Sequence, residues 1–247
     1  MMILNDTARA RSQLFQLLAL GFMHPDAAFH RVLVDGSYTH ALVQAASSAG
    51  CAGQFAHREA SGFADFEAGY IHLFQMGRGG KPVVALTAGD HKEIAWAHGP
   101  TEGRPAEGRP EFLLQYTAWY RHFGLKINED ENANELPDHL ACQLEFMAWL
   151  NHLEGNAAQD EVHRRGYQRA QMDFLQRHLL PFLETLVMEL RRHSEQSPCC
   201  LFHLSLAIWA LAATDTMLAL LASSIALVNP TETDGDTDQI AAVNLWG

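Results

Sequence analysis

The feature that most constrains the fold of this chain is a run of almost wholly apolar residues from 198 to 228. The run is longer than the roughly 20 residues that a membrane-spanning helix needs. However, His203 and Asp215 interrupt it, and neither end carries the basic cluster that usually marks a spanning segment. A helix that is apolar nearly all round is otherwise the central helix of a bundle. We favour that interpretation and expect no stable membrane insertion.

The rest of the chain has helical periodicity, and no alternating strand pattern of useful length is present. Pro181 should end or kink a helix near Leu180. Ser197 and Pro198 supply a cap and a first-turn proline for the long apolar helix. The sequence therefore predicts an all-α, single-domain helical bundle. Besides the apolar run, its helices are expected at five segments: 6–23, 54–75, 111–123, 137–153 and 157–193.

Two stretches lack this periodicity. Residues 77–110 contain seven glycines and four prolines. A loop of that length inside a compact domain is usually functional or disordered. Residues 229–247 are acidic, and we expect them to form a flexible tail. The chain is thus interpreted as one helical domain over 1–228, with a long loop at 77–110, followed by the tail.

The composition limits the partners of the chain. Its formal net charge is −12. Phosphate neutralisation dominates affinity for nucleic acid, so such an acidic chain is a poor candidate for that function. A cationic partner would instead be attracted.

The four cysteines form no Cys-x-x-Cys pair, and the first residues lack a basic region followed by an apolar run. Free thiols and a cytoplasmic location are expected.

The segment 135–150 carries the clearest local signal. Pro137 suits the first turn of a helix because its missing N–H would have no partner there. Asp138 then lies where the helix dipole favours negative charge, and His139 titrates near neutral pH. An apolar repeat follows at helical spacing. The segment is therefore predicted to be a rigid helix with a polar tip.

Two interpretations of that helix are compatible with the residues. Asp138, Cys142 and Glu145 share one face, with His139 beside them, and all are of types that bind metal or transfer protons. The alternative is an ordinary polar face, which we favour because such mixed spacing specifies no metal. The chain has no nucleotide-binding glycine motif and no nucleophile elbow. We expect no catalytic residue, metal or cofactor, and keep a metal- or cofactor-binding helical enzyme as the alternative.

Several motifs together resemble the TorD/DmsD/NarJ family of molybdoenzyme chaperones. The most specific is Glu135-Leu-Pro-Asp-His-Leu140, followed by Leu-Glu-Phe-Met at 144–147. Tyr-Ile-His-Leu-Phe at 70–74, the aromatic helix before the signature, and Phe-Leu-x-x-His-Leu at 174–179 agree in order. In the TorD/DmsD branch of this family the loop carries a Pro-x-Glu-Ser-x-Tyr type motif. Here Gly77-Arg-Gly-Gly-Lys-Pro82 and the Val-Val-Ala-Leu that follows are closer to the nitrate-reductase-chaperone branch.

The resemblance implies a cytoplasmic chaperone, not an enzyme. Its partner would be the N-terminal or signal segment of the catalytic subunit of a DMSO-reductase-family molybdoenzyme, bound by a monomer or weak dimer. Carboxylates pair well with arginine, so an acidic helix tip suits a basic peptide end. On this basis Asp138→Ala should weaken peptide binding without unfolding the protein. The expected peptide-binding residues are Glu135, Pro137, Asp138, His139, Tyr70 and Phe74.

Overall fold

The chain is all-helical over the residues that the structure describes, as the sequence predicts. In this computed structural model the only extended pairing within those residues is an isolated antiparallel bridge between Thr87 and His139. The predicted tail, 229–247, lies outside the described residues, as does much of the predicted loop. The described residues are 2–51, 55, 57, 61–77, 79–91, 108–125, 135–193 and 198–226.

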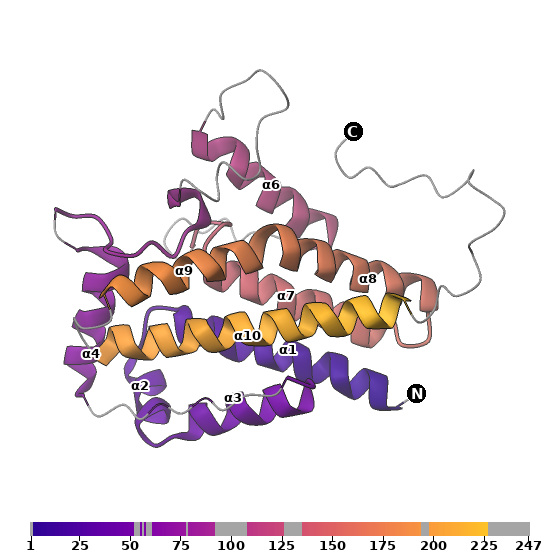
Figure 1. Cartoon of the computed structure of the whole chain (residues 1–247), viewed down its shortest axis with the longest axis horizontal. Coiled ribbons are helices and arrows are strands. Elements are labelled where there is room, and N and C mark those ends of the chain that lie inside the picture. The colour runs from indigo at the N-terminus through magenta and orange to yellow at the C-terminus, as the bar shows by residue number, and fades with distance from the viewer. Residues whose placement is uncertain are drawn as a thin grey trace.

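The long apolar run forms helix α10, which spans Pro198–Ala226 and begins at the predicted proline. Figure 1 shows α10 crossing the molecule beside α9 (Leu180–His193). It also contacts α1, α4 and α8. Its outward face remains exposed at Leu201 and Ile208, so it is packed on one side and not enclosed all round. Among the described residues it is the one helix long and apolar enough to cross a membrane, and 44% of its apolar window is buried.

Helix α1 (Met2–Phe22) packs extensively against α7 (Leu140–Asn156). Leu14, Leu18, Leu144 and Phe146 are all buried in the core that these helices share with their neighbours. Ser12 Oγ also donates a hydrogen bond of 2.8 Å to the Ala148 carbonyl. This pairing gives α7 a rigid base for the turn that precedes it.

Two helices that the sequence analysis did not delimit follow α1. Helix α2 (Ala27–Val34) begins at Asp26, whose side chain accepts a hydrogen bond of 2.7 Å from the Phe29 N–H. Helix α3 (Ser37–Ser48) then packs along α1. Both are short, and isolated helices of this length are only marginally stable in water, so their stability comes mainly from packing of buried residues such as Phe29, Leu33 and Leu42.

The segment predicted at 157–193 is a helix with an irregular centre. Helix α8 (Glu161–Phe174) leads into a π-helical turn, η3 (Leu175–Leu179), and then into α9. At the end of η3 the Leu180 N–H bonds to the Leu175 carbonyl, five residues back. Pro181 follows immediately and has no N–H to donate. The helix therefore does not end at the proline, and the expected disturbance takes the form of a π turn just before it.

The observed helix starts differ from the predicted ones. The helix expected from residue 6 begins at Met2, and the one expected from residue 157 begins at Glu161. The helix expected at 54–75 begins at Phe63, as α4 (Phe63–Tyr70) followed by a π-helical turn, η1 (Ile71–Gln75). The helix expected from Pro137 begins at Leu140. The helix expected at 111–123 was nearly correct, since α6 spans Gly108–His122.

A buried polar network ties α7 to α8. The Glu154 side chain, which is buried, accepts hydrogen bonds from Gln168 Nε2 at 2.6 Å and Gln171 Nε2 at 2.9 Å. Arg11 of α1 lies 4.0 Å from the same carboxyl group. Since a buried donor that loses its acceptor keeps its full desolvation cost, this network depends on Glu154.

Glu154→Ala should therefore lower the free energy of unfolding by about 1–3 kcal/mol, because it removes the acceptor of two buried amides. Urea denaturation followed by circular dichroism measures the change. Glu184→Ala, at an exposed position of α9, is the matched control and should change stability by less than about 0.5 kcal/mol. Equal effects of the two substitutions would contradict the assigned role.

Candidate functional site

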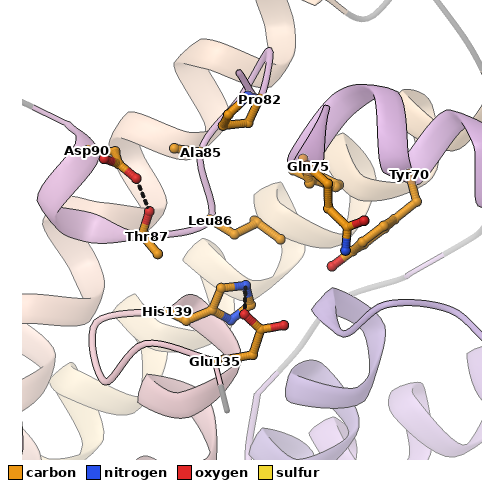
Figure 2. Close-up of a pocket in the computed structure, with 10 residues that line it drawn as sticks. Tyr70, Gln75, Pro82, Ala85, Leu86, Thr87, Asp90, Glu135 and His139 are labelled. Carbon is orange, nitrogen blue, oxygen red and sulfur yellow. Dashed lines mark hydrogen bonds and ion pairs between the residues drawn. The ribbon is translucent and has the colours of Figure 1, made fainter. Parts of the chain in front are cut away.

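A pocket of about 220 Å³ opens where the end of η1, the following loop and the turn before α7 meet. It is smaller than the roughly 300–1,000 Å³ of typical small-molecule sites, so it suits a single side chain better than a whole ligand. Figure 2 shows Glu135 and His139 on one side, Tyr70 and Gln75 on another, and Thr87 with Asp90 on a third. The lining residues are Tyr70, Phe74, Gln75, Pro82, Ala85, Leu86, Thr87, Asp90, Glu135 and His139.

The aromatic wall of the pocket consists of Tyr70, the last residue of α4, and Phe74, which lies in the π turn η1. Its last hydrogen bond runs from the Met76 N–H to the Ile71 carbonyl, at 2.7 Å. A π turn places its side chains differently from an α-helical turn, and such turns often occur at functional sites. Within it, Phe74 is almost fully buried but still reaches the pocket. The Leu73 carbonyl then accepts hydrogen bonds from the N–H groups of Val83 and Val84, both at 2.9 Å, which folds the loop back onto η1.

Gly77 makes this return possible. Its N–H donates to the Lys81 carbonyl at 2.7 Å and closes the turn. A Cβ atom at position 77 would lie 2.6 Å from Val83 Cγ2 and 2.8 Å from the Lys81 carbonyl oxygen. Only glycine fits there without a shift of the backbone.

The turn before α7 is fastened to the loop by main-chain contacts and one side chain. The Leu140 N–H donates to the Leu86 carbonyl at 2.8 Å, and the Ala88 N–H donates to the Asp138 carbonyl at 3.1 Å. The Asp138 carboxyl group accepts a third bond, of 2.8 Å, from the Gly89 N–H. We call these three contacts the clip. They hold the loop wall of the pocket against the start of α7.

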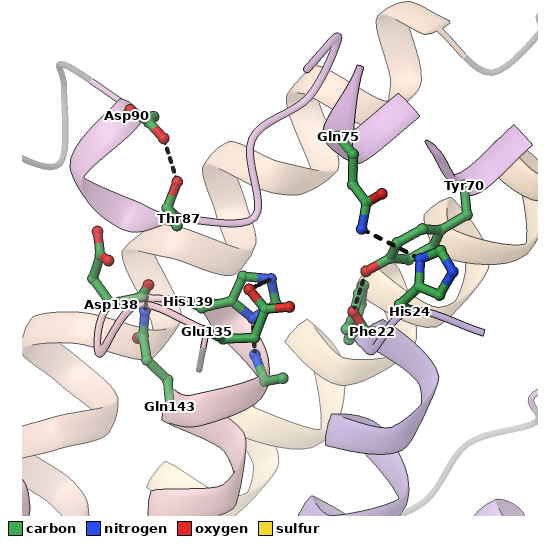
Figure 3. A network of polar contacts seen from close by, with 11 residues as sticks. Phe22, His24, Tyr70, Gln75, Thr87, Asp90, Glu135, Asp138, His139 and Gln143 are labelled. Carbon is green, nitrogen blue, oxygen red and sulfur yellow. Dashed lines mark hydrogen bonds and ion pairs between the residues drawn. The ribbon is translucent and has the colours of Figure 1, made fainter. Parts of the chain in front are cut away.

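Asp138 therefore does not have the position that the sequence suggested. It is 0% exposed, and it points toward the loop away from the pocket (Figure 3). Pro137 is half-buried, does not line the pocket, and its carbonyl accepts a hydrogen bond of 2.6 Å from the Tyr120 hydroxyl. The sequence analysis placed Asp138 on the first turn of the helix, whereas it lies in the turn before α7, where its carboxyl group accepts a hydrogen bond from a loop N–H.

His139 is the N-cap of α7. Its Nδ1 accepts a hydrogen bond of 3.2 Å from the Ala141 N–H, so the proton of the neutral ring is on Nε2. That Nε2 faces the Glu135 carboxylate at 3.7 Å (Figure 2). Burial lowers the pKa of His139, and the nearby Glu135 opposes this only in part. We conclude that His139 is neutral at pH 7.

The pocket is electrostatically negative. The Glu135 side chain is 50% exposed and can reach a ligand. Asp90 lies across from it and is hydrogen-bonded to the Thr87 hydroxyl. No lysine or arginine is among the lining residues in the described part of the chain. The pocket thus favours a cationic group over an anionic one.

Tyr70 and Phe74 contribute ring surfaces. The Tyr70 hydroxyl is occupied by a 2.9 Å hydrogen bond to the Phe22 carbonyl, and burial raises its pKa (Figure 3). Beside it, Gln75 Nε2 lies 3.2 Å from His24 Nδ1. The polar end of Tyr70 is therefore turned into the protein, and its ring is what faces the pocket.

Four of the six predicted residues meet at the pocket, and two do not. Tyr70, Phe74, Glu135 and His139 line it. The residues that sequence reasoning missed follow Phe74 in η1 or lie in the predicted loop at 77–110, whose length and glycine content were the available signal. These missed residues are Gln75, Pro82, Ala85, Leu86, Thr87 and Asp90.

The alternative metal or acid–base cluster does not converge. The Asp138 carboxyl group is bonded to Gly89, and His139 Nδ1 to Ala141. Burial raises the pKa of the Cys142 thiol to about 12, which disfavours the thiolate that a metal requires. Within the described residues no three His, Cys, Asp or Glu side chains lie close enough to hold a metal ion.

Comparison with known proteins identifies the family. The family model described as nitrate reductase delta subunit matches residues 35–188, which is more than half of the chain. This chain belongs to the nitrate reductase delta subunit family. The resemblance to the NarJ-type chaperones is thereby confirmed. No solved structure matches the chain.

Curated relatives of the family agree with one another in their names. The chain is 41% identical, over 97% of its length and 93% of the relative's, to the dimethyl sulfide dehydrogenase assembly chaperone protein of Rhodovulum sulfidophilum. It is 33% identical, over 72% and 76%, to the perchlorate reductase assembly chaperone protein of Dechloromonas aromatica. It is 32% identical, over 78% and 80%, to the selenate reductase assembly chaperone protein of Thauera selenatis.

The clip leads to a prediction that differs from the one made from sequence. Asp138→Ala should lower the free energy of unfolding by about 1–3 kcal/mol, because it leaves the Gly89 N–H without its acceptor. Thermal and urea denaturation measure this. Asp215→Ala, at an exposed position of α10, is the control. Unchanged stability in Asp138→Ala would show that the clip is not structural.

Proposed function

We propose that this protein is an assembly chaperone that binds the N-terminal segment of the catalytic subunit of a molybdenum-containing oxidoreductase. The family and the names of its relatives support the chaperone role. The similarity over nearly the whole chain to a chaperone for dimethyl sulfide dehydrogenase favours a client of that enzyme class. The protein would act in the cytoplasm, before its client is exported or attached to a membrane.

The contact model rests on the combination of accessible carboxylates with apolar walls. Glu135 and Asp90 both line the pocket and are exposed, and Asp90 is already hydrogen-bonded to Thr87. A guanidinium group could pair with Glu135 through two parallel hydrogen bonds. The rings of Tyr70 and Phe74 would cover the apolar stem of the bound side chain. We therefore propose that the pocket receives one basic side chain of the client segment.

The rim of the pocket offers apolar surface for the residues on either side of that basic one. Met76, which follows the lining residue Gln75, is 67% exposed, and Leu136, which follows Glu135, is also exposed. A contiguous exposed apolar patch next to a pocket is typical of a protein-binding surface, and we propose that Met76 and Leu136 belong to one. A segment that alternates basic and apolar residues fits this arrangement. The net charge of −12 would further attract a basic segment at long range.

The proposal assigns the protein no catalysis. It requires no metal or cofactor, and a monomer or weak dimer is sufficient because every proposed contact comes from one chain. The enzyme alternative has no supporting observation, since its four candidate residues serve as a loop contact, a helix cap, a protonated thiol and a surface carboxylate.

Glu135→Gln tests the contact directly. It should weaken binding of a peptide copied from the client's N-terminal segment about tenfold, since the substitution removes the charge but keeps the size, and a tenfold change is about 1.4 kcal/mol. Fluorescence anisotropy of a labelled peptide gives the affinity. Glu184→Gln on α9 removes the same charge at an exposed position of another element and should leave the affinity unchanged.

A second arm uses the peptide. Replacing its basic residues one at a time with citrulline or norleucine should weaken binding to the wild-type protein at one position in particular. The same replacement should cost the Glu135→Gln variant much less, because the partner charge is already absent. If the replacement weakens peptide binding to the wild-type protein and to the Glu135→Gln variant by the same factor, Glu135 is not the partner of that peptide residue.

A further inference from the structure

A buried histidine lies directly behind the aromatic wall of the pocket. His203, near the start of α10, is 1% exposed and does not line the pocket. Its ring centroid is 4.8 Å from that of Phe74, with the rings at 74°, and 5.6 Å from that of Tyr70. These are the distances of edge-to-face and tilted aromatic pairs. Three more aromatic rings, those of Phe22, Phe66 and Phe202, lie around it, and the Cys199 Sγ atom is 3.5 Å from its Nδ1.

The imidazole is held by a hydrogen bond that a purely apolar ring could not make. His203 Nδ1 lies 2.8 Å from the Cys199 carbonyl oxygen, which can only accept, so Nδ1 donates. The bond fixes the ring relative to α10. Because the surrounding rings pack against the imidazole, their orientation is fixed to α10 in turn.

We infer that His203 is a positioning residue for the pocket, which sets the orientation of Phe74 and Tyr70 without touching the ligand. This inference rests on the proposed function, since it names the residue that shapes the surface on which the client's side chain would lie. It also gives a role to a buried polar residue that is surrounded mainly by aromatic rings. Helix α10, the longest helix among the described residues, is thereby connected to the binding surface.

The variant His203→Phe keeps a ring of similar size and removes the hydrogen bond to Cys199. It should weaken peptide binding about five- to tenfold, because Phe74 and Tyr70 lose their fixed support. Trp209→Phe, also buried on α10 but packed against Phe55, is the control and should bind as the wild type does.

A double-mutant cycle separates positioning from general destabilisation. In a Phe74→Leu background, His203→Phe should weaken peptide binding by a smaller factor, at most about threefold, because one of the two rings that it positions is gone. In a Glu135→Gln background, His203→Phe should weaken peptide binding by the same factor as in the wild type, because the ion pair of Glu135 does not depend on the orientation of the rings. The same factor in all three backgrounds would overturn the inference, since it would indicate a general loss of structure.

A measurement without peptide keeps this test separate from the proposed function. The methyl groups of Leu86, which line the pocket together with Phe74, can be followed by carbon-13 NMR of the free protein. His203→Phe should shift them through altered ring currents, whereas Trp209→Phe should not. Unshifted Leu86 signals in His203→Phe would overturn the inference. A wild-type protein that binds no peptide would contradict the proposed function, and the methyl signals would still decide the role of His203.

Discussion

The hydrogen bond between the Asp138 carboxyl group and the Gly89 N–H connects segments that are 49 residues apart in the sequence. A buried carboxyl group is costly unless its oxygens accept hydrogen bonds, and a buried main-chain N–H is costly unless it donates one. Here Oδ2 of the Asp138 carboxyl group is the acceptor for the Gly89 N–H. With the two main-chain bonds beside it, this contact holds an irregular loop on the start of α7, and α7 is itself packed along α1. The pocket exists because that loop has a fixed position.

The two acidic residues of the signature segment consequently have different roles. Asp138 is buried and holds the loop wall of the pocket in place, whereas the Glu135 side chain is half exposed and places its negative charge at the opening of the pocket. His139 lies between them as a helix cap and is neutral at pH 7, so it does not cancel the charge of Glu135. A site that keeps the carboxylates of Glu135 and Asp90 accessible and is otherwise lined by apolar and neutral side chains is suited to recognising one basic side chain among apolar neighbours.

Local sequence rules predicted those parts of the fold that local interactions determine. Pro198 marked the start of α10, and the spacing of Tyr70 and Phe74 placed both on one helical segment that reaches the pocket. The start of α7 was misplaced because Pro137 satisfies the rule for a first helical turn, yet its carbonyl is bound by Tyr120. The contributions of Thr87 and Asp90 were not predictable, since they depend on where a glycine-rich loop returns to the bundle.

Site-specific photocrosslinking with the client's catalytic subunit tests the central claim most directly. A benzophenone amino acid placed at Met76, on the rim, should crosslink to the N-terminal segment of the client. The same group at Val162, which is 79% exposed on α8 at the other end of the bundle, should not (Figure 1). Crosslinks from position 162 without any from position 76 would contradict the account, because the client would then bind away from the pocket.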